Sequence, residues 1–87
     1  MTDTLRPMHE WLIAASERLA AESGGEPSDY VLSQQEIDDL LELARVASHE
    51  SGERINAPLV CYLVGLARAR SGRELGDLVD AVVGKTV

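Results

Sequence analysis

The chain has 87 residues, a formal net charge of −7 and a single cysteine, and 45% of its residues are hydrophobic. The length and composition are typical of one small globular domain. The single cysteine excludes an internal disulfide. The net negative charge disfavours nucleic-acid binding, which needs a basic surface. The N-terminus lacks the pattern of a signal peptide. The longest uncharged run covers residues 55–67 and is shorter than the roughly 20 residues that span a membrane. We therefore expect a cytoplasmic protein that binds no membrane.

The first helix is predicted over residues 5–22. Asp3 or Thr4 would cap its start, and Pro7 falls in the first turn, where proline is tolerated because the backbone donors lack partners there. Its apolar residues recur at helical spacing and are expected to face the core. They are Trp11, which we expect to anchor the core, and Leu12, Ala15 and Leu19. Glycine and proline residues then predict a loop over residues 23–32.

The second helix is predicted over residues 33–50. Ser33 and Glu36 have the spacing of a capping box, in which each side chain bonds a free backbone N–H of the first turn. Acidic residues crowd the first turn, where the helix dipole favours negative charge. The stripe that we expect to be buried consists of Ile37, Leu40, Leu41, Ala44 and Ala47.

Two further helices are predicted over residues 57–70 and 72–83. The third begins around Pro58 and carries apolar residues on nearly all sides, which predicts a central place in the packing. The fourth follows a tight turn, with Ser71 as its cap and Glu74 at the matching position of a capping box. Because nothing indicates a strand or a repeat, we expect an all-α fold: a compact bundle of four short helices in a single domain, residues 1–87.

The candidate ligand-binding residues are Arg45, His49 and Arg54. Arg45 and His49 are four residues apart and share a helix face, and Arg54 lies in the following loop. One interpretation is structural, because basic residues near a helix C-terminus stabilise its unpaired carbonyls and the negative end of its dipole. The other is a binding pocket for an anion, nucleotide or carboxylate, since arginine makes bidentate contacts with such groups. Both interpretations stay open at this point.

Catalytic and metal chemistry find little support in the sequence. Zinc sites need clustered cysteine and histidine, whereas Cys61, His9 and His49 are far apart along the chain. His49 and Cys61 could form a thiol–histidine pair if their helices are antiparallel neighbours, but a free cysteine in an apolar helix usually packs as a small hydrophobic residue. We therefore expect no catalytic residues, no metal and no cofactor, and a protein that is not an enzyme.

Three segments carry a resemblance to a known family: EWLIAASERLA, LLELARVASH and RINAPLVCYLVGLA. They resemble a small bacterial all-helical domain of unknown function that occurs alone or fused to molybdopterin-guanine dinucleotide biosynthesis protein A-like nucleotidyltransferases. The resemblance covers roughly residues 10–67 and leaves the fourth helix unaligned. Its pattern falls on Trp11, Leu12, Leu41, Leu43, Ala44, Arg45, His49, Arg54, Ala57, Pro58, Leu59, Leu63 and Gly65.

The leading hypothesis is a non-catalytic helical accessory or interaction protein. The resemblance implies a link to molybdenum-cofactor guanylyltransferase, with a nucleotidyltransferase as the protein partner, although this chain contains no nucleotidyltransferase domain of its own. One alternative is a small anion- or nucleotide-binding module that uses Arg45, His49 and Arg54. The other is a plain homodimer built on the apolar helices.

Overall fold

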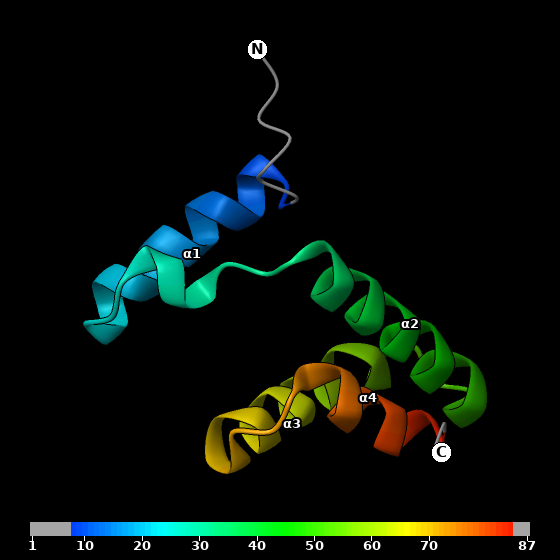
Figure 1. The fold of residues 1–87 in the computed structure, drawn as a ribbon. Helices are drawn as coiled ribbons and strands as arrows, with labels where there is room; N and C mark the ends of the chain where they lie inside the picture. The colour runs from blue at the N-terminus through cyan, green and yellow to red at the C-terminus, as the bar shows by residue number, and fades with distance from the viewer. Residues whose placement is uncertain (1–7, 85–87) are drawn as a thin grey trace. The chain divides into compact units, whose positions relative to one another are not determined.

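Four α-helices and one 3₁₀ helix make up the regular structure of residues 8–84, the part of the chain that the computed structural model describes (Figure 1). In chain order they are α1 (Glu10–Ser23), η1 (Pro27–Tyr30), α2 (Gln34–Ser51), α3 (Asn56–Ser71) and α4 (Leu75–Val83). No strand occurs in this described range, so the predicted all-α fold class is confirmed. Contacts along the chain group into two units, one that ends at Gln35 and one that begins at Glu36.

The first helix begins directly after His9, later than the predicted start at residue 5. His9 has an extended backbone (φ −62°, ψ 150°), and its Nδ1 accepts a hydrogen bond of 3.1 Å from the Trp11 N–H. This side chain caps the helix because it satisfies one of the first-turn N–H groups that lack an intrahelical acceptor. The predicted caps, Asp3 and Thr4, and the predicted first-turn Pro7 lie outside the described residues.

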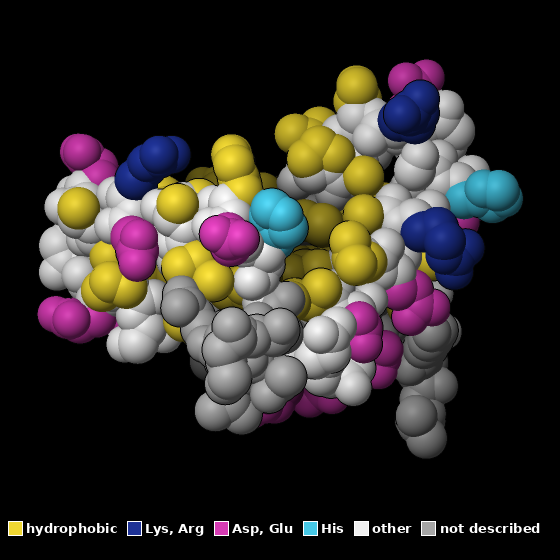
Figure 2. Space-filling view, turned by 90° about the horizontal axis from the view of Figure 1, so that it is seen from above, with side chains coloured by type: hydrophobic (Ala, Val, Ile, Leu, Met, Phe, Trp, Pro, Cys, Tyr) yellow, Lys and Arg dark blue, Asp and Glu magenta, His cyan; other side chains and the backbone are white. Residues whose placement is uncertain are grey.

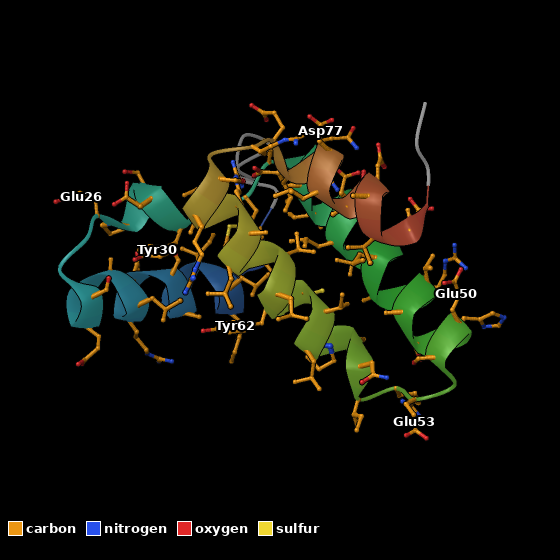
Figure 3. All side chains as sticks on the ribbon, turned by 90° about the horizontal axis from the view of Figure 1, so that it is seen from below. Glu26, Tyr30, Glu50, Glu53, Tyr62 and Asp77 are labelled. Carbon is orange, nitrogen blue, oxygen red and sulfur yellow. The ribbon has the colours of Figure 1, made fainter. Side chains whose placement is uncertain are left out.

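The predicted loop after α1 contains the short helix η1. A reciprocal pair of hydrogen bonds closes it: the Glu26 N–H donates to Asp29 Oδ2 at 3.0 Å, and the Asp29 N–H donates to the Glu26 carbonyl at 2.9 Å. η1 packs back on α1, where the Ser23 and Tyr30 hydroxyls form a hydrogen bond of 2.9 Å. Figure 3 labels Glu26 and Tyr30 at the two ends of this turn. Local hydrogen bonds therefore order a segment that the sequence predicted as a loop.

The α1 helix buries a different face from the predicted one. The buried side chains of the helix are Ser16 and Ala20. Met8, which precedes the helix, is also buried, and the Leu32 N–H donates to Met8 Sδ at 3.2 Å. Three residues of the predicted stripe lie exposed instead, while Ala15 is half-buried. Trp11 is 67% exposed, so its expected role as a core anchor is wrong. We call the exposed residues Trp11, Leu12 and Leu19 the α1 apolar face.

The second unit has its own small core. Its buried members are Leu43 from α2, Val64 from α3, and Leu75 and Val79 from α4, and partly buried residues of the same helices surround them. Leu43 is fully buried, whereas Leu41, which was predicted in the buried stripe, is 65% exposed. Leu40 and Leu43 are three residues apart and together define the buried side of α2, so Leu41 falls away from it.

The turn between α3 and α4 differs from the predicted one. Ser71 is the last residue of α3, where its hydroxyl donates to the Ala67 carbonyl at 2.7 Å and accepts from the Arg73 N–H at 3.1 Å. Gly72 follows in the left-handed conformation (φ 72°), which ends the helix. The cap position of α4 is Glu74, so the predicted role of Ser71 as that cap is wrong and α4 begins at residue 75 instead of 72.

Helix α3 is less central than its composition predicts. Val64 is the one buried residue of this helix. Four large apolar side chains in and just before the helix are more than half exposed: Ile55, Leu59, Tyr62 and Leu63. We call these four the α3 apolar face. The helix therefore packs with one side within its own unit, and the other elements of that unit leave its apolar side exposed.

Candidate functional site

The predicted ligand-binding residues lie along the last half of α2 and in the turn after it. Arg45 and His49 belong to α2, and Arg54 stands two residues before α3. All three residues are exposed. Arg45 Nη2 lies 3.9 Å from Glu42 Oε2 on the same helix, and within residues 8–84 no hydrogen bond or ion pair joins any two of the three residues.

The backbone and one serine hold the turn between α2 and α3. Gly52 ends α2, and its N–H donates to the Ser48 carbonyl at 3.0 Å. The Ser51 hydroxyl accepts from the Glu53 N–H at 3.1 Å and donates to the Glu53 carbonyl at 3.2 Å. Arg54 contributes its own carbonyl, which accepts from the Ala57 N–H at 3.2 Å. In Figure 3 the labelled Glu50 and Glu53 mark the two sides of this turn.

Arg45 and His49 share their helix face with Leu41. The three residues follow one another at intervals of four, which places them in one row along α2, and all three are exposed. We call this row the α2 basic face. Sequence reasoning assigned Leu41 to the core and so missed its place beside the two basic residues. The signal that identifies it is the four-residue spacing that Leu41 shares with them.

Hydrophobic side chains are a visible part of the protein surface. Figure 2 shows them between basic, acidic and histidine side chains on the face that it displays. Single exposed apolar residues are ordinary in proteins, but groups of them mark sites of interaction. In the part of the chain that is described, such groups are the α1 apolar face and the α3 apolar face.

Cys61 is half-buried on the inner side of α3. Its Sγ lies 4.0 Å from the Leu40 carbonyl oxygen, and burial raises the pKa of the thiol above its ordinary value. A raised pKa keeps the sulfur protonated at neutral pH, and the protonated thiol is a poor nucleophile. No interaction joins Cys61 to the exposed His49 in the described structure, so the thiol–histidine pair is not assembled there.

The described residues contain no group of three or more histidine, cysteine, aspartate or glutamate side chains with an arrangement that suits a metal ion. Within the same range, every helix is too short or too polar to cross a lipid bilayer.

The comparison with known protein families shows which family the chain belongs to. The family described as "Domain of unknown function (DUF6457)" matches residues 3–86. The chain belongs to this family. The match extends beyond the resemblance predicted over residues 10–67 and includes α4, which that resemblance left unaligned. Neither the curated proteins nor the solved structures yield a match to the chain.

Proposed function

We propose that this member of the DUF6457 family is a non-catalytic helical accessory protein that binds a partner protein through the α2 basic face. One observation carries the proposal: Arg45 and His49 lie exposed in the same row as Leu41, which is 65% exposed. Protein interfaces combine apolar contacts with arginine, and arginine is among the residues that contribute most to binding energy. The row offers both kinds of contact on one rigid helix.

The electrostatics of Arg45 suit a contact with a carboxylate of a partner. Its pairing with Glu42 spans 3.9 Å, and the arginine side chain is 68% exposed. Exposed pairs of this kind contribute about 0 to 1 kcal/mol to stability. An exchange of Glu42 for a carboxylate of the partner therefore costs little, and a bidentate contact would gain directional hydrogen bonds.

The partner that we propose is a nucleotidyltransferase of the molybdenum-cofactor guanylyltransferase type. Support comes from the resemblance to domains that occur fused to such enzymes, because fusion holds two interacting domains at high effective concentration. Where such a domain occurs alone, as the resemblance implies for some members, a surface contact must replace the covalent link. The α2 basic face is the surface that we assign to this contact.

The test is direct binding between the purified chain and a purified molybdenum-cofactor guanylyltransferase from the same cells, measured by calorimetry. We expect Arg45→Glu to weaken binding at least tenfold, because it places like charge against the carboxylate of the partner. Arg18→Glu makes the same charge change on an exposed residue of α1 and should leave the affinity unchanged. Equal affinities for the two variants would overturn the assignment of the face, and no binding by the natural chain would overturn the partner.

A further inference from the structure

The start of α1 is capped by a side chain of a type that titrates. His9 occupies the cap position, and its Nδ1 accepts the Trp11 N–H at 3.1 Å. The usual cap residues are serine, threonine, asparagine and aspartate, and they keep their acceptor oxygens throughout the neutral pH range. Histidine side chains, in contrast, change charge between about pH 5 and 8. The first turn of α1 therefore has a cap whose acceptor can be lost within that range.

Only the neutral imidazole can form this hydrogen bond. In the neutral ring one nitrogen carries a proton and the other accepts, so the bond from the Trp11 N–H requires the ring proton to be on Nε2. In the charged ring both nitrogens carry a proton and donate, and Nδ1 can no longer accept. The added positive charge also lies at the end of the helix where the dipole is positive. Protonation of His9 thus removes the cap and places an unfavourable charge at the same point.

A second contact joins the start of α1 to the segment that leads into α2. Met8 directly precedes the cap residue and is buried, and its Sδ accepts the Leu32 N–H at 3.2 Å. Both residues belong to the unit that ends at Gln35, and Leu32 lies two residues before the first residue of α2. Because Met8 and His9 are consecutive, fraying of the backbone at His9 also displaces Met8. We therefore expect the cap and the Met8 contact to be lost together.

The charged groups around His9 are few within the described residues. The ring is exposed, and its one hydrogen bond or ion pair in residues 8–84 is the bond from Trp11. On its own helix the neighbouring acid is Glu10. The η1 turn packs on α1 and contributes the titratable groups of Glu26, Asp29 and Tyr30. The Tyr30 hydroxyl bonds the last residue of α1, at the end of the helix away from His9. Residues 31–33, which follow η1, carry no charged side chain.

We propose that His9 is a pH-sensitive cap that controls the start of α1. The neutral ring caps the helix and keeps Met8 on the Leu32 N–H, and the protonated ring releases both contacts. The capped form prevails at the upper end of the histidine range and is lost as the pH falls through it. Acidification thus loosens the segment that leads into α2. This conformational change lies within the first unit and goes beyond the accessory function proposed for the α2 basic face.

The first test is nitrogen NMR of the two imidazole rings in the full chain. At about pH 8, we expect the His9 ring to carry its proton on Nε2 and to have an unprotonated Nδ1. His49 is the internal control, because it is exposed and has no hydrogen bond in the described structure that would fix one tautomer. A His9 ring that carries its proton on Nδ1 under these conditions, or that shows the same mixture of tautomers as His49, would overturn the proposal.

The second test measures hydrogen exchange of the Trp11 and Leu32 N–H groups as the pH falls from about 8 to 5. The reference is His9→Asn, because an asparagine cap accepts the same bond and does not titrate. Relative to this variant, the protection of both groups in the natural chain should fall about fivefold. His49→Asn removes the other histidine and should leave that fall unchanged.

Three results would contradict the pH-sensitive cap. The first is equal protection in the natural chain and in His9→Asn at every pH, and the second is a fall that His49→Asn abolishes. The third is a fall at Trp11 with none at Leu32, which would show that the cap does not control the Met8 contact. Far-UV circular dichroism should show that both variants keep their helices, so that a difference in exchange reports on the start of α1.

Discussion

Replacement of Leu43 by alanine should destabilise the protein severely. Leu43 is completely buried among Val64, Leu75 and Val79. Truncation of a buried leucine to alanine costs about 2 to 5 kcal/mol, because apolar burial is lost and a cavity remains. A chain of this size has a total stability of about 5 kcal/mol. A loss of about 3 kcal/mol would lower the ratio of folded to unfolded molecules more than a hundredfold.

The assay is urea unfolding followed by far-UV circular dichroism at one fixed protein concentration. With a denaturant dependence of about 1 kcal/mol per molar urea, the midpoint should fall by about 3 M. The matched control is Leu41→Ala, which makes the same substitution two residues earlier in α2. Because Leu41 is 65% exposed, this change should alter stability by less than about 0.5 kcal/mol.

The comparison between the two leucines can refute the assignment of the buried face of α2. Equal losses from Leu41→Ala and Leu43→Ala would show that packing does not distinguish the two side chains. A larger loss from Leu41→Ala would show that α2 buries the stripe predicted from the sequence. Only a loss confined to Leu43→Ala agrees with the packing described above.

Gly65 lies within α3 and Gly72 follows its last residue, and replacing them by alanine should change the free energy of unfolding in opposite directions in the same assay. Gly65→Ala should stabilise the protein by about 1 kcal/mol, because the site is helical and no atom lies within 4 Å of the added carbon. Gly72→Ala should destabilise it by about 1 to 2 kcal/mol, because its φ is 72°. Changes of the same sign in the free energy of unfolding would contradict the backbone conformations described for the two glycines. Burial raises the pKa of the Cys61 thiol above its ordinary value of 9.0, so the folded state holds this proton more tightly than the unfolded state. Its contribution to stability is therefore constant below pH 9 and declines as the pH rises through the folded-state pKa. Cys61→Ala should lack this decline. A difference in the free energy of unfolding between the two proteins that does not change with pH would contradict the raised pKa.

Local signals in the sequence predicted much of the fold. Ser33 correctly marked the start of α2, which begins at the next residue, and the glycines after the first helix correctly marked the end of α1 at Gly24. These features depend on a few neighbouring residues and their backbone preferences, so a sequence carries them directly. Ser71 failed as a cap for α4 because a serine can equally bond the end of the preceding helix, which is what it does.

The choice of buried face was harder to predict than the helices themselves. Leu40, Leu41 and Leu43 are close together, so periodicity alone allowed two overlapping stripes, and packing against Val64 selected one of them. Trp11 was expected inside because it recurs with other apolar residues at helical spacing, yet the residues that α1 buries are Ser16 and Ala20. In the candidate site, the spacing correctly placed Arg45 and His49 on one face. Their exposure depends on neighbours distant in sequence, which spacing does not reveal.

The packing of neighbouring elements has a consequence for the speed of folding. Helix α1 packs against η1, which follows it directly, and α3 packs against α4, which follows it directly. Contacts between adjacent segments close short loops, and little chain entropy is lost before they form. Small helical proteins with such short-range contacts fold in microseconds to milliseconds. The two adjacent pairs can thus re-form quickly after each unfolding event, whereas the core that joins Leu43 of α2 to Val79 of α4 must close a longer loop.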